Sequence, residues 1–264
     1  MDMGNSYQAL ERKQFRKTPS CRILRSHKVH RNDTGAHDWG TIRVGPVLLP
    51  PPGRCYVGKV RLTNAIDQFK IENPEVQVRV CFSPYLVDPT IPAEGEDHVD
   101  YVARRWGNED WTLSAQSSSV TDGVGFANWK TWPNSLLAHR LQKFSEGYDR
   151  GNEVNSLIFD TIYERGGNVS NLDTLVSIAH EAGLPEAATH RYLASREGVD
   201  TIINEDLHAK NVLNIMSAPQ YVLRGASPMP GGISVPGNSG RAIVLQGAVS
   251  SLNIVQALWS APSK

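Results

Sequence analysis

The sequence predicts an α/β fold in which a small sheet is interrupted by a long all-helical insertion. Three observations predict it: a strand–helix–strand pattern over residues 41–82, a run of helical segments from about 96 to 211, and two strand-like segments with a final helix after residue 219. A chain of 264 residues is long for one minimal domain, so a single core with a sizeable insertion accounts for the length.

The opening unit begins with a strand at 41–49, which Gly45 and Pro46 weaken. A helix follows, because apolar residues between 62 and 69 recur at the spacing i, i+3, i+4, i+7. Apolar and polar residues then alternate over 76–82, which is the period-two pattern of a strand. Such a unit is expected to be parallel and right-handed.

The middle of the chain is predicted to be helical, with glycines where several helices stop. The expected helices are 96–106, 134–146, 152–164, 171–182, 186–194 and 196–211. The stretch between 107 and 132 gives no pattern. It is rich in serine, glycine and tryptophan, and its tryptophans either pack together or line a cleft for an aromatic ligand.

Strand character returns at 219–223 and 242–246, and a helix follows at about 250–259. The Gly/Pro/Ser-rich stretch 225–241 between the two strands is expected to be a long, mobile hairpin loop. The order β-α-β, helices, β-β-α is the thioredoxin arrangement with an insertion. We therefore expect a thioredoxin-like domain at 39–88 and 212–264 and a helical insertion domain at 89–211.

Composition excludes several function classes. No apolar run approaches the roughly 18 residues of a membrane span, and a formal net charge of zero gives no reason to expect nucleic acid. The histidines show no ligand spacing, so no metal site is expected. Three cysteines without a CxxC pair fit neither a disulfide framework nor a zinc site, and indicate a reducing, cytoplasmic compartment.

The neutral total hides a basic N-terminus. Residues 1–32 carry eight basic side chains against Asp2 and Glu11, and few large apolar residues. A segment of this composition cannot bury enough apolar area to offset its ordering entropy. We expect residues 1–38 to form a disordered tail that folding does not need.

Five segments together carry a family resemblance, and each keeps its place in the chain order. They are Cys55-Tyr-Val-Gly-Lys-Val-Arg-Leu62, Phe82-Ser-Pro-Tyr-Leu-Val-Asp-Pro-Thr-Ile-Pro92, Pro133-Asn-Ser-Leu-Leu-Ala-His-Arg-Leu141, Ala182-Gly-Leu184 and Ser217-Ala-Pro219. Over about residues 55–260 the chain resembles the DsbA-like thioredoxin superfamily, specifically its FrnE-like branch. Kappa-class glutathione transferases and hydroxychromene-carboxylate isomerases are related branches with the same inserted-helix fold.

The sequence departs from this family at the first cysteine of the active site. The family pattern is Cys-Pro-Trp-Cys-Tyr-x-Gly-Lys, whereas this chain has Pro52-Gly53-Arg54-Cys55. Disulfide exchange needs one sulfur to attack and another to resolve, so Cys55 alone cannot complete a dithiol cycle. The serine that the glutathione-linked branches use at the first position is absent too.

The resemblance still implies a site at the start of this helix. Cys55 is the candidate catalytic residue, since a helix N-terminus and a neighbouring cation favour a thiolate, although an inert relic is the competing interpretation. The candidate substrate-binding residues are Arg54, Tyr56, Asn134, His139, Ala218 and Pro219. Pro219 matches the cis-proline of the family. Asn134 could equally cap a helix, and His139 could equally be a structural histidine.

The function implied is that of an oxidoreductase homologue with a degenerate active site, acting as a small-molecule isomerase, cyclase or glutathione-linked enzyme. Glutathione is the one candidate cofactor, a small molecule is the expected partner, and a homodimer is left open. Two alternatives stand beside it. One is a non-catalytic peptide-binding or chaperone-like module; the other is a dithiol–disulfide oxidoreductase whose true N-terminus is not represented by residues 1–54.

Overall fold

The computed structural model describes residues 41–48, 53–108, 117, 120–224, 233–234 and 241–261. The expected tail at 1–38 lies outside these residues, so its disorder stays a prediction. Among the described residues, no helix is long and apolar enough to cross a membrane.

A mixed sheet forms the base of the molecule, with the strand order β2-β1-β5-β7-β6. Strands β1 and β2 are parallel, whereas β1–β5, β5–β7 and β7–β6 are antiparallel. The strands are β1 (Thr41–Leu48), β2 (Gln77–Ser83), β5 (Gln220–Arg224), β6 (Ile233–Ser234) and β7 (Arg241–Gln246). The parallel opening pair and the antiparallel closing pair are the thioredoxin arrangement that the order of elements predicts.

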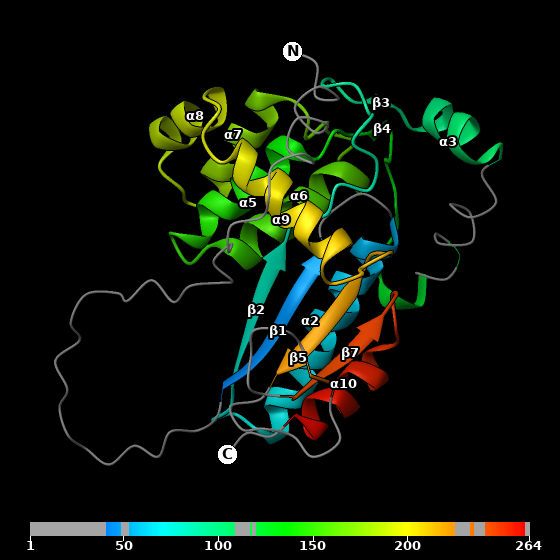
Figure 1. Cartoon of the computed structure of the whole chain (residues 1–264), viewed down its shortest axis with the longest axis vertical. Helices are drawn as coiled ribbons and strands as arrows, with labels where there is room; N and C mark the ends of the chain where they lie inside the picture. Colours follow the sequence, from blue (N-terminus) through cyan, green and yellow to red (C-terminus); the bar gives the residue numbers. More distant parts are fainter. Residues whose placement is uncertain are drawn as a thin grey trace, which may run out of the picture.

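Helices α2 (Gly53–Glu72) and α10 (Ser251–Ser260), which lie far apart in the sequence, pack against each other and against this sheet (Figure 1). Helix α10 starts at a sequence-encoded cap, where the Ser250 hydroxyl accepts a hydrogen bond from the backbone N–H of Asn253 at 3.3 Å. Buried Leu62 and Leu258 belong to the same hydrophobic core as the sheet residue Tyr221. The two helices therefore close one face of the sheet.

The chain between β2 and β5 contributes the helical part, which gathers at one end of the sheet in Figure 1. Its elements are β3 (Glu96–Asp97), α3 (His98–Trp106), the 3-10 helix η1 (Val120–Asp122), β4 (Thr131–Trp132), α5 (Leu136–Glu146), α6 (Gly151–Tyr163), α7 (Leu172–Glu181), α8 (Glu186–Ala194) and α9 (Val199–Asn211). All six helices expected here form, with ends within three residues of expectation.

Two details differ from the sequence expectations. Glu96 and Asp97, expected to begin a helix, form a short strand paired with Thr131–Trp132, and Asp97 instead caps α3 through the N–H of Val99 at 2.8 Å. Within the expected loop 225–241, Ile233–Ser234 pairs with β7. Both are two-residue ladders, which are too short for a periodic pattern of apolar and polar residues to indicate.

The tryptophans of the 107–132 region that the structure describes pack against one another. Trp132 is fully buried, and its ring centroid lies 5.4 Å from those of both Trp129 and Trp106. His98 and Tyr101 complete the cluster, with ring centroids 3.9 Å from Trp129 and 4.1 Å from Trp132 respectively. Packing, rather than an open aromatic cleft, accounts for these three tryptophans; Trp111 lies outside the described residues.

Candidate functional site

Cys55 lies in the first turn of α2, where its side chain is completely buried. Burial raises the pKa of its thiol well above the usual range because desolvation penalises the thiolate. The adjacent Arg54 is exposed to solvent. The expectation that a helix N-terminus and Arg54 favour a thiolate is therefore outweighed by burial, and the thiol is neutral at physiological pH.

Pro219 lies on the same side of the sheet as this first turn. The Ala218–Pro219 peptide bond is cis, as the resemblance implies. A Cβ atom on Gly58 would overlap the hydroxyl of Tyr221 and would lie 2.9 Å from Pro219 Cγ. Because position 58 carries no side chain, α2 can approach the 217–220 turn closely, one helical turn after Cys55.

Three tyrosines from separate parts of the chain lie within electrostatic reach of Cys55: Tyr85 after β2, Tyr163 at the end of α6 and Tyr221 on β5. Burial is the main cause that raises the pKa of each phenol, and the charge of a Cys55 thiolate would raise each further. Tyr163 and Tyr221 are completely buried, and Tyr85 is 7% exposed. The thiol thus has three protonated phenols in its electrostatic surroundings, which the sequence analysis did not identify.

Tyr56 is half-buried and belongs to an aromatic stack at the same place. Its ring lies 5.2 Å from Tyr163 at an interplanar angle of 8°, and 5.6 Å from Phe159. Burial raises the pKa of its phenol, and a hydrogen bond and the charge of Glu164 raise it further. Glu164 also accepts the backbone N–H of Phe126 at 3.2 Å, so Tyr56 is firmly held.

Asn134 is committed to local structure. Its Nδ2 donates to the carbonyl of Ile91 at 2.8 Å, and its Oδ1 accepts the N–H of Leu136 at 3.1 Å, at the start of α5. Its own backbone N–H donates to Ser170 Oγ at 2.8 Å. These bonds join three segments of the insertion, which is the helix-capping alternative weighed from the sequence. Its expected role in substrate binding stays a prediction.

His139 lies on α5 and is 2% exposed. Burial lowers its pKa to about 4; a nearby backbone group of Tyr85 opposes the shift, and the charge of Lys210 adds to it. The imidazole is therefore neutral at physiological pH. Its place beside Tyr85 brings it to the edge of the Cys55 site, although it is a residue of the insertion.

A buried ion pair, also missed from the sequence, fixes Tyr85. Asp206 on α9 is completely buried, accepts the N–H of Leu86 at 2.8 Å and pairs with Lys210 at 2.8 Å. Lys210 also donates to the carbonyl of Leu86 at 2.7 Å and lies 4.8 Å from the centroid of the Tyr85 ring. Tyr85 in turn packs in a small core that Ala218 adjoins. Helix α9 thus holds both Tyr85 and the turn before Pro219.

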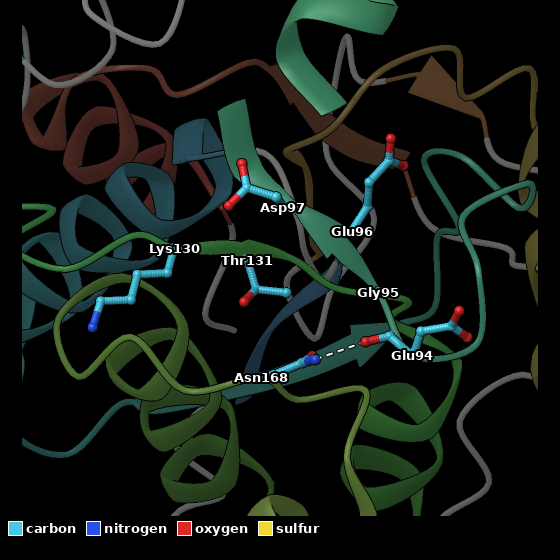
Figure 2. Close-up of a pocket in the computed structure, with 7 residues that line it drawn as sticks. All are labelled: Glu94, Gly95, Glu96, Asp97, Lys130, Thr131 and Asn168. Carbon is cyan, nitrogen blue, oxygen red and sulfur yellow. Dashed lines mark hydrogen bonds between the residues drawn. The ribbon is translucent and has the colours of Figure 1, made fainter. Parts of the chain in front are cut away.

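A shallow pocket of about 350 Å³ lies elsewhere, around the β3–β4 ladder (Figure 2). It is lined by Glu94, Gly95, Glu96, Asp97, Lys130, Thr131 and Asn168. The polar groups already have structural partners: Glu96 pairs with Arg104 at 2.8 Å, and Asn168 donates to the carbonyl of Glu94 at 2.7 Å. In the described part of the chain, no cluster of His, Cys, Asp and Glu side chains could hold a metal ion.

Comparison with solved structures decides the fold. The chain superposes on a probable DsbA oxidoreductase from Streptomyces coelicolor with a TM-score of 0.66 at 17% identity, over 85% of this chain and 92% of the other. The chain has a DsbA-like thioredoxin fold. A proposed protein disulfide isomerase from Nitrosomonas europaea gives a TM-score of 0.58 at 12% identity, over 83% and 96% of the two chains.

Sequence comparison adds a relative without an assigned activity. The Bacillus subtilis protein YwbO, described as uncharacterized, is 26% identical over 179 residues, which are 67% of this chain and 84% of that protein. No family model matches the chain. The DsbA-like resemblance is confirmed as a fold, and the activity must be argued from the site itself.

The DsbA-like fold brings together the residues that the resemblance names at its centre: Cys55, Tyr56 and the Ala218–Pro219 turn. His139 reaches this site through Tyr85, whereas Asn134 makes its hydrogen bonds to Ile91, Leu136 and Ser170. Tyrosine is common in cores, so nothing in the sequence marked Tyr163 and Tyr221 as neighbours of the thiol.

Proposed function

We propose that this protein uses the DsbA-like fold for small-molecule chemistry of the isomerase, cyclase or glutathione-linked kind, without a dithiol cycle. The observation that carries the proposal is the state of Cys55. The position of the attacking thiol is Pro52, and the remaining thiol is completely buried with a raised pKa. Thiolate attack needs an ionised thiol, and burial keeps this thiol protonated.

The groups around Cys55 suit a different chemistry. Tyr85, Tyr163 and Tyr221 are neutral phenols, and fixed neutral donors stabilise an oxygen that gains negative charge during a reaction. Exposed Arg54 at the start of α2 is a cation that an anionic part of the ligand can contact. A glutathione carboxylate is a natural occupant of that position. We therefore infer a ligand that spans the 54–58 and 217–220 turns.

The first test separates this proposal from dithiol chemistry. We expect insulin reduction by the full chain to be no faster than by an equal concentration of free thiol. Cys55→Ser should leave that rate unchanged. Catalysis that Cys55→Ser abolishes would overturn the proposal, and catalysis that Cys81→Ser abolishes would reveal an unforeseen pair of thiols.

The second test measures ligand binding by calorimetry with reduced glutathione. We expect Arg54→Ala to weaken binding about tenfold, because it removes one charge-assisted contact. Arg191→Ala, at an exposed position on α8, is the matched control and should leave the affinity unchanged. Glutathione binding that is equal in both variants would remove Arg54 from the site.

A peptide-binding module is the second candidate, and one observation favours it. Met216 is 81% exposed and Val212 is 47% exposed, immediately before the 217–219 turn. Exposed apolar side chains beside a fixed turn can hold an extended peptide. If this is the function, Met216→Lys should abolish binding of a reduced, alkylated unfolded protein, whereas Arg54→Ala should have no effect on it.

A further inference from the structure

We propose that Tyr163 and Tyr221 form a buried site for one oxygen atom of a small carboxylate or carbonyl compound, beside the Cys55 thiol. This inference deepens the proposed function and rests on it, since it names the part of the ligand that enters the interior. The contacting group must be a hydrogen-bond acceptor.

The first step is that both hydroxyl groups are buried without a partner. Tyr163 and Tyr221 are each completely buried, and neither hydroxyl has a hydrogen-bond partner among the residues that the structure describes. An unpaired buried hydroxyl destabilises the fold, and phenylalanine at the same position would avoid that penalty. Two such groups at one place therefore indicate a partner from outside the chain.

The second step is that both tyrosines lie beside the first turns of α2, in the same hydrophobic core as Cys55. The Tyr221 hydroxyl reaches the position that a Cβ of Gly58 would occupy, one turn along α2 from Cys55. Tyr163 stacks on Tyr56, the residue after Cys55. Both phenols lie within electrostatic reach of the same thiol. Three elements, α2, α6 and β5, thus bring one thiol and two phenols into the same region of the core.

The third step is the character of these groups. Both phenols are protonated at physiological pH, and so is the thiol, because burial disfavours their charged forms. Each hydroxyl can donate, and the thiol is a weak donor. The nearby carboxylate of Glu164 is already bonded to Tyr56 and to backbone N–H groups of the 126–127 segment. Two phenolic hydroxyls that can each donate a hydrogen bond fit a ligand oxygen, which can accept both.

The test uses acetate as a carboxylate probe and acetamide as a neutral carbonyl probe, each added to the full chain at constant ionic strength. We expect one of them to raise the melting temperature in a saturable manner. Tyr163→Phe and Tyr221→Phe should each weaken that probe about tenfold. Tyr148→Phe, at a 46% exposed tyrosine, is the control and should bind as the parent chain does. The better probe identifies the ligand class.

Both phenylalanine variants should fold, because each removes a hydroxyl that has no partner in the described chain. In the absence of probe they should be as stable as the parent or more stable. The phenolic proton resonances of Tyr163 and Tyr221 should move downfield when the probe binds to the parent chain. The inference is overturned if neither probe binds, or if binding survives in both phenylalanine variants.

The design separates this inference from the proposed function. Glutathione binding that depends on Arg54 but not on Tyr163 or Tyr221 would retain the function and refute the buried oxygen site. Probe binding that both phenylalanine variants weaken, in a chain that does not bind glutathione, would retain the buried site and refute the glutathione-linked function. A slowly exchanging water between the two hydroxyls, undisplaced by either probe, would also refute the inference.

Discussion

Replacing Gly58 with alanine tests how closely α2 must approach the turn that contains Pro219. In an unobstructed helix interior, alanine is more favourable than glycine by about 0.5–1 kcal/mol. At position 58 the added Cβ would overlap the Tyr221 hydroxyl and would lie 2.9 Å from Pro219 Cγ. Neither neighbour can move freely, since Tyr221 is completely buried on β5 and the proline ring is rigid.

The magnitude follows from these opposing effects. Forcing an extra carbon into a packed core costs about 1–3 kcal/mol, which exceeds the helix-propensity gain. We expect Gly58→Ala to lower the free energy of unfolding by about 1–2 kcal/mol. In a chain of this size that loss lowers the melting temperature by about 2–4 °C per kcal/mol.

The assay is urea-induced unfolding followed by tryptophan fluorescence. Gly147→Ala is the control, since its Cβ would meet only the carbonyl of Phe144 at 3.4 Å, an ordinary contact. The double variant Gly58→Ala/Tyr221→Phe removes the overlapping hydroxyl and should recover part of the loss. The reasoning is refuted if Gly58→Ala stabilises the protein, or if its effect is the same with and without Tyr221→Phe.

Three further predictions concern buried polar groups. Burial lowers the pKa of His139 to about 4, so its imidazole stays neutral in the folded chain, whereas in the unfolded chain it takes up a proton below pH 6.5. The free energy of unfolding should therefore fall by about 3 kcal/mol between pH 6.5 and 4. Urea titrations of His139→Gln over the same pH range should lack this fall. The Cys55 thiol stays protonated in the folded chain while the unfolded thiol ionises, so stability should fall above pH 9.0, and Cys55→Ala should show a smaller fall. Arg140 is 2% exposed, and its guanidinium donates hydrogen bonds to the carbonyls of residues 192, 193, 195 and 197. Arg140→Met should lower the free energy of unfolding, measured by thermal unfolding, by about 3 kcal/mol. The control Arg150→Met, at an exposed arginine, should lower it by about 0.5 kcal/mol or less.

Local patterns predicted most of the fold because its elements obey local rules. The alternation at 76–82 became β2, and the apolar spacing at 62–69 lies in the buried face of α2. Gly45 and Pro46 weakened the prediction of the first strand from sequence. In the structure they coincide with an irregularity in the β1–β2 register between Val44 and Val47. The two-residue strands were not predicted because they are too short to show a period-two pattern.

The candidate site was predictable only in part, for a physical reason. Motif order predicts that Cys55 faces the cis Pro219; in the structure Pro219 has a cis peptide bond and lies beside Gly58, one helical turn after Cys55. The helix N-terminus, which favours a thiolate at Cys55, is a local effect that can be read from the sequence. Burial, on which the inert-relic alternative depends, is tertiary: Cys55 shares one hydrophobic core with Tyr163 on α6 and Tyr221 on β5, more than 100 residues along the chain.

The position of the helical insertion also affects how the protein is made. One edge of strand β1 pairs with β2, which follows soon after it in the sequence. The other edge pairs with β5, and the paired residues Arg43 and Arg224 are about 180 residues apart. During synthesis at about 5–20 residues per second, β1 emerges roughly ten to forty seconds before that partner exists. An open strand edge can pair with other chains. Local contacts let the insertion helices form first, so a nascent chain carries a folded helical unit while its sheet is still incomplete.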